Sequence, residues 1–129
     1  HPLAARGTLM FEPTLAELLD TIDGCVMSTL LGYDGIDLGR AMAPQIKGQT
    51  DHLVVETAAL MNRMRQVSNQ LRMGAVKELS IEAEELILVL RPVDERFVLA
   101  VALKPDGNLG MARYQLAAKV PDLRRALAT

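Results

Sequence analysis

The chain has 129 residues, half of them apolar, and a formal net charge of -2 at neutral pH. That length predicts one domain with a substantial core, and two Phe, two Tyr and no Trp make the core aliphatic. The near-neutral charge and the shortage of aromatic rings argue against nucleic acid as a partner. One cysteine and no apolar run of about twenty residues argue against disulfides and membrane insertion, so we expect a cytoplasmic protein.

The first nine residues show no clear periodicity, and we expect residues 1–9 to be a cloning remnant or a disordered tail. Met10 is then the native start, and residues 10–129 form the domain. Pro13 suits the first turn of a helix, and the apolar residues that follow it at helical spacing predict a short amphipathic helix. We expect this helix to stop at the Asp23-Gly24 pair.

Residues 25–42 predict a β-hairpin. Residues 25–31 are apolar and partly β-branched, and residues 36–42 supply the returning strand. The Asp34-Gly35 pair between them is a strong turn signal.

A long helix is predicted from Thr50, a plausible N-cap, to Gly74. One apolar stripe on it consists of Leu53, Leu60, Met64, Val67 and Leu71. A second set, which consists of Val54, Ala58 and Met61, makes the apolar surface wider than one sheet face requires. The surplus indicates a second contact surface on this helix.

Three further strands are predicted at residues 76–81, 86–90 and 97–103, and the last two are dense enough in apolar residues to be central strands. A final helix is expected to begin near Asn108, with Pro121 kinking or restarting it. The element order α-β-β-α-β-β-β-α predicts an α/β/α sandwich, of the α+β type, around a five-stranded antiparallel sheet. Hairpin-joined strands distinguish this fold from a doubly wound nucleotide-binding fold.

The sequence shows no pattern typical of a catalytic, metal or cofactor site, so we expect none of these and no enzyme activity. Cys25 stands alone, and His52 lies near the start of a helix without further ligand candidates. The glycines of the first hairpin do not have phosphate-loop spacing. Glu82, Glu84 and Glu85 are expected in a solvated hairpin turn rather than in an acid/base pair.

Taken in order, these elements resemble the roadblock/dynein light chain domain, and in particular its MglB-like bacterial branch, described as regulators of Ras-like GTPases. The resemblance spans residues 13–127. It is carried by the hairpin turn at 33–36 with the long helix after it, the strands at 74–81, 86–92 and 97–103, and the segment Asn108-Leu109-Gly110-Met111-Ala112-Arg113. The last of these is the most specific.

The resemblance implies a homodimer in which the long helix and the third strand of two copies pair and extend the sheet. A free strand edge would favour such an isologous contact. The expected dimer-interface residues are Leu60, Met61, Val76, Leu79 and Ile81. The expected partner is a Ras-like small GTPase, and the contact candidates on the long helix are Arg63, Arg65 and Gln66.

The implied function is that of a non-catalytic adaptor that stimulates GTP hydrolysis by biasing the switch loops of the GTPase, without an arginine finger. Arg40 and Arg91 are the other candidates for an arginine finger. The position of each at the charged end of a strand is the simpler explanation. Two alternatives stay open: a pure scaffold without effect on hydrolysis, and a monomeric small-molecule sensor. Asp37 after the turn and Pro121 in the last helix depart from the family pattern.

Overall fold

The sheet and its helices follow the predicted order. The computed structural model describes the backbone of residues 2–128 and the side chains of residues 11–46 and 51–128. The helices are α1 (Pro2–Thr21), the short 3-10 helix η1 (Pro44–Gln49), α2 (Thr50–Gln70) and α3 (Leu109–Leu127). The strands are β1 (Cys25–Gly32), β2 (Asp37–Met42), β3 (Leu79–Glu82), β4 (Ile87–Pro92) and β5 (Phe97–Leu103).

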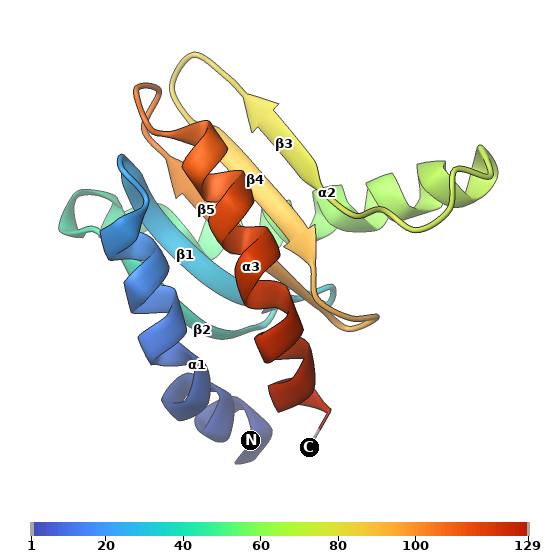
Figure 1. Cartoon of the computed structure of the whole chain (residues 1–129), viewed down its shortest axis with the longest axis horizontal. Helices are drawn as coiled ribbons and strands as arrows, with labels where there is room; N and C mark the ends of the chain where they lie inside the picture. Colours follow the sequence, from blue (N-terminus) through green and yellow to red (C-terminus); the bar gives the residue numbers. More distant parts are fainter. Residues whose placement is uncertain (1, 129) are drawn as a thin grey trace.

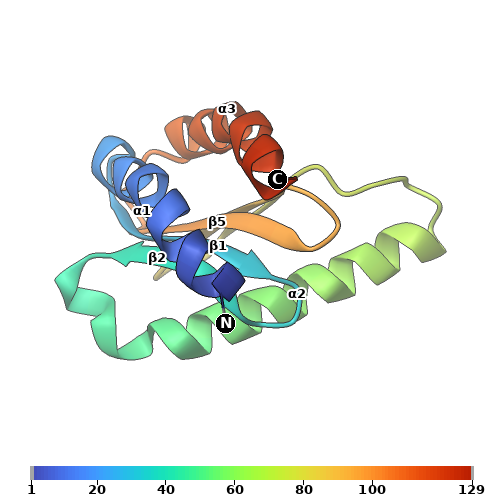
Figure 2. The same cartoon turned by 90° about the horizontal axis from the view of Figure 1, so that it is seen from below.

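The five strands form one antiparallel sheet in the order β2-β1-β5-β4-β3. Helices α1 and α3 lie on one face of this sheet and α2 crosses the other, which confirms the predicted α/β/α sandwich (Figures 1 and 2). Every residue of β5 is buried, as expected of a central strand covered on both faces. Strand β4 is next to the edge, and β3 and β2 are the two edge strands.

Two separate cores fill the layers. Under α1 and α3, Leu15, Leu18, Leu116 and Leu123 pack with Leu99 and Val101 of β5. Under α2, Val54, Ala58 and Met61 pack with Leu31, Leu90 and Val98. Both cores are aliphatic and contain few aromatic rings, as the composition predicted.

The start of α3 is fixed next to the start of β1. The N–H of Asn108 donates to the carbonyl of Asp23 at 2.9 Å, and the N–H of Lys104 donates to the carbonyl of Gly24 at 2.8 Å. Asn108 also caps α3, because its side-chain oxygen accepts the N–H of Met111 at 3.0 Å. The predicted helix start at Asn108 is confirmed.

Two prolines lie inside helices, where the sequence predicted a boundary. Helix α1 begins at Pro2 and contains Pro13, and α3 continues through Pro121 without restarting. Buried residues on both sides of each proline hold the helix to the sheet: Phe11 and Leu15 in α1, and Val120 and Leu123 in α3. This packing offsets the one backbone hydrogen bond that each proline removes. The side chains of residues 1–9, for which a cloning remnant or tail was expected, lie outside the described residues.

Helix α2 ends four residues before the predicted stop at Gly74. The N–H of Met73 donates to the carbonyl of Ser68 and that of Arg72 to the carbonyl of Asn69, which is the hydrogen-bond pattern of a Schellman motif. Arg72 takes the left-handed position of this motif with φ 55°, where glycine is usual. The predicted N-cap, Thr50, has a side chain outside the described residues.

Strand β3 is shorter than predicted. It comprises four residues, Leu79–Glu82, and residues 76–78 approach it as an irregular segment that no ladder includes. Leu79 pairs with Leu90 and Glu82 with Ile87, so Arg91 and Pro92 at the end of β4 have no partner in β3. The prediction of a strand from Val76 was wrong at its first three residues.

Two glycines with positive φ allow a matched test of the packing where β1 and α3 begin. A Cβ on Gly24 would lie 2.5 Å from Cα of Gly107, whereas a Cβ on Gly74 would meet nothing within 4 Å. Gly24 has φ 83° and Gly74 has φ 88°, so alanine pays a similar backbone cost at each, about 1–2 kcal/mol. We predict that Gly24→Ala lowers the free energy of unfolding by at least about 2 kcal/mol more than Gly74→Ala, measured by urea denaturation. Equal losses would contradict the described contact.

Candidate interaction surface

Helix α2 turns a different face to the sheet from the one expected. Val54, Ala58 and Met61 are almost fully buried against it, although the sequence reading treated them as the surplus. Met61 was an expected interface residue, but it is 0% exposed and has no surface to offer a second copy. The reason is geometric, because helical spacing identifies sets of residues that share a face but not which set faces the sheet.

The predicted apolar stripe lies on one flank of α2. Leu53, Leu60, Met64 and Val67 are half-buried, and Leu71, just past the helix, is 65% exposed. At about 100° per residue, this flank is opposite Asn62, whose side chain donates to the carbonyl of Tyr33 at 2.7 Å. Leu60, an expected interface residue, belongs to this flank. Leu53 still packs against the core under α2, and the rest of the stripe is the apolar surface that this core leaves over.

The three candidate contact residues on α2 do not share one face. Arg63 and Gln66 are exposed and joined by a hydrogen bond of 3.2 Å. Arg65 points elsewhere: its guanidinium lies 4.0 Å from the centre of the Tyr33 ring. The structure brings Arg63 and Gln66 together and places Arg65 in a groove at the end of the sheet.

The remaining expected interface residues lie along the β3 edge. Leu79 and Ile81 are half-buried and point to the α2 side of the sheet, while Ser80 and Glu82 alternate with them and are exposed. Val76, also half-buried, packs against the same core from the irregular segment. Among residues 2–128, the strand order leaves this edge without a neighbouring strand.

An ion cluster lies beside that edge on the α3 side. The carboxylate of Glu78 binds Nη1 of Arg91 at 3.2 Å and Nε of Arg113 at 2.8 Å. Sequence reasoning missed Glu78 and Arg113 as a pair because 35 residues separate them and no local pattern joins them.

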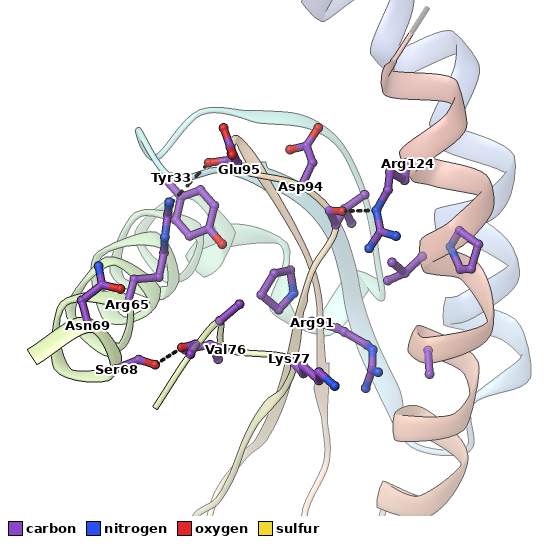
Figure 3. A pocket seen from close by; sticks show the side chains of 17 residues that line it. Tyr33, Arg65, Ser68, Asn69, Val76, Lys77, Arg91, Asp94, Glu95 and Arg124 are labelled. Carbon is purple, nitrogen blue, oxygen red and sulfur yellow. Dashed lines mark hydrogen bonds between the residues drawn. The ribbon is translucent and has the colours of Figure 1, made fainter. Parts of the chain in front are cut away.

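A groove of about 680 Å³ opens beside the segment at 74–77 that precedes β3, between α2, this segment, the β4–β5 turn and α3 (Figure 3). Its apolar wall includes Val76, Pro92, Val93, Val120 and Pro121. Arg65 lies along the Tyr33 ring on one side, and Nε of Arg124 donates to the carbonyl of Val93 at 2.9 Å on the other (Figure 3). Burial raises the pKa of Tyr33, with the Arg65 charge acting in the opposite direction.

Cys25, Arg40 and Arg91, which were considered for chemical roles in the sequence, all have partners within the protomer. Burial raises the pKa of the Cys25 thiol to about 11, which makes it a poor nucleophile at neutral pH. Arg40 binds Asp37 at 2.6 Å and Asp51 at 2.7 Å, and Arg91 binds Glu78. Within the described residues, no group of three or more His, Cys, Asp or Glu side chains is placed to hold a metal ion.

A helix that crosses a bilayer needs about twenty mostly apolar residues. Among the described residues, no helix combines the length and the hydropathy needed to cross a membrane.

Residues 14–103 match the model of the Roadblock/LC7 domain family, which is well over half of the chain. The chain belongs to this family. The match ends before Asn108–Arg113, the most specific segment of the resemblance seen in the sequence. No curated protein matches the chain.

Solved structures share the fold. A Roadblock/LC7 domain from Streptomyces avermitilis is 20% identical with a TM-score of 0.78, over 89% of this chain and 95% of that one. MglC from Myxococcus xanthus is 28% identical with a TM-score of 0.67, over 90% and 98%. Myxococcus xanthus MglB is 20% identical with a TM-score of 0.78, over 92% and 90%. The chain is thus similar along nearly its whole length to domains of this family.

Proposed function

We propose that this chain is a non-catalytic, homodimeric adaptor of the cytoplasm that binds a small Ras-like GTPase and stimulates its GTP hydrolysis. Membership of the Roadblock/LC7 family supports the adaptor role. The observation that carries the proposal is the pair of surfaces left open in the protomer: the short β3 edge and the apolar flank of α2.

The homodimer is the simplest arrangement that covers both surfaces. The β3 edge carries the half-buried Leu79 and Ile81, and an unpaired strand edge favours the addition of another strand. A second copy related by a two-fold axis supplies the same edge in the antiparallel direction. The same axis brings the two α2 helices near each other, where Leu60 and its neighbours on the flank find apolar partners.

The GTPase contact is proposed on the outer side of α2. Arg63 and Gln66 are exposed, are already joined to each other and take no part in either core. Such a contact stimulates hydrolysis by favouring the competent arrangement of the switch loops. No arginine finger is needed, and Arg40 and Arg91 are engaged in ion pairs of their own.

Two alternatives make different predictions. A pure scaffold uses the same surfaces without affecting hydrolysis, and it binds the GTP and GDP forms equally. A small-molecule sensor is favoured by one observation, the groove of about 680 Å³ lined by Tyr33 and Arg65. A sensor of that kind gains thermal stability with its ligand.

The edge pairing is tested by Leu79→Arg. Two buried guanidinium groups at a two-fold edge are costly, so this variant is predicted to sediment as a monomer at concentrations at which the wild type is a dimer. Ile36→Arg is the matched control, because Ile36 is 63% exposed at the turn of the first hairpin, away from the β3 edge. A Leu79→Arg protein that remains dimeric would contradict the edge pairing.

The GTPase contact is tested by titrating the host's small Ras-like GTPase, loaded with a non-hydrolysable GTP analogue or with GDP, against the protein. Preference for the GTP form is expected, and Arg63→Ala with Gln66→Ala is predicted to weaken that binding about tenfold. Arg125→Ala is the control, since Arg125 is exposed near the end of α3 and its described ion pair is with Asp122 of the same helix. If the double variant binds as tightly as the wild type, the GTPase contacts a different surface. Equal binding of the GTP and GDP forms of the GTPase would favour the scaffold.

A further inference from the structure

The ion cluster beside the β3 edge has an excess positive charge. Glu78 is 18% exposed and is shared by two arginines, so one carboxylate faces two guanidinium groups. Arg113 is 56% exposed and uses only its Nε for Glu78. Both terminal nitrogens of Arg113 have no described partner and remain available to a further anion.

Glu82 is an exposed carboxylate at the other end of the same strand. Its carboxylate has no hydrogen bond or ion pair within the part of the chain that the structure describes, and it is exposed. Since side chains alternate along a strand, Glu82 lies on the same face as Ser80, the α3 side of the sheet. Its pairing with Ile87, a member of the core under α1 and α3, agrees with this placement.

Antiparallel pairing of two β3 strands restricts which residues can face each other. A two-fold axis perpendicular to the sheet keeps α3 of both copies on the same side, and residues directly opposite then share a face. With Ser80 on the axis, Leu79 faces Ile81 of the second copy, and position 78 faces position 82. In this register the Leu79–Ile81 pair forms twice, once on each side of the axis, and both pairs lie on the α2 side of the sheet. Moving the axis to Ile81 instead pairs Ile81 with itself and Leu79 with Ala83, and Glu82 then faces Ser80 of the second copy rather than position 78.

We propose that Glu82 of a second copy completes the Arg91–Glu78–Arg113 cluster, and that two such networks fix the register of the dimer. The inference rests on the proposed homodimer and names the contact that selects one pairing. With Glu82 added, two arginines meet two carboxylates at each network, and the excess charge is neutralised. Arg113 bridges Glu78 of its own chain and Glu82 of the other. Charge pairs of this kind select a register more than they add affinity.

The network is tested by two charge reversals studied alone and mixed. In a homodimer of Arg113→Glu, each network contains three carboxylates and one arginine. In a homodimer of Glu82→Arg, each network contains three arginines and one carboxylate. Each variant is predicted to self-associate about tenfold or more weakly than the wild type, measured by analytical ultracentrifugation. Mixed together, they restore one native and one reversed network, so a heterodimer is predicted to form at wild-type affinity.

Controls separate this contact from general charge effects and from loss of the fold. Arg125→Glu on the same helix and Glu12→Arg on α1 change charge by the same amounts away from the edge, and both are expected to dimerise normally. Circular dichroism checks that each variant is folded, and Arg113→Gln gives an intermediate weakening without a new charge. Dimers of the single variants at wild-type strength, or no preference for the heterodimer, would overturn the register while leaving the homodimer standing. A wild type that is monomeric at all concentrations would instead remove the proposed homodimer itself.

Discussion

Strand β5 is buried along its whole length on both faces, and this constraint determines the rest of the arrangement. Helices must cover both sides of the sheet, and the polar groups beneath them must find partners inside. Ser28 shows how this is met: it is fully buried in β1, and its hydroxyl donates to the carbonyl of Leu15 in α1 at 2.5 Å. With both faces of the sheet used for the core, its edges and the outer sides of its helices are left for partners.

The two edges of the sheet differ in a way that explains which of them is available. At β2, Arg40 is only 19% exposed because it binds Asp37 of its own strand and Asp51 of α2. Charged side chains therefore lie on the α2 side of this edge, which disfavours the addition of another strand there. At β3, the half-buried Leu79 and Ile81 flank an exposed serine, and the ion pairs described beside this edge lie on the α3 side. The asymmetry favours association through β3, next to the open flank of α2.

Much of the fold follows from local patterns, whereas the details of the surface do not. The dense apolar strands, the Asp34-Gly35 turn and the Asn108 cap are short-range signals, and they predicted the layers and the order of elements correctly. The orientation of α2 was predicted wrongly because apolar residues cover more than one of its faces. The early end of α2 was missed because Arg72 occupies a position where glycine is the usual signal. Glu78 and Arg113 meet only in the folded chain, so no spacing reveals them.

The account depends most directly on the claim that a second copy covers the β3 edge. Hydrogen–deuterium exchange of residues 79–82, measured over a series of protein concentrations, tests this claim without a substitution. Protection of these amides is predicted to rise with concentration, whereas that of the β2 edge stays constant and serves as the internal reference. Protection of β3 that does not depend on concentration, in a protein shown by sedimentation to associate, would mean that the copies meet elsewhere and would contradict the account.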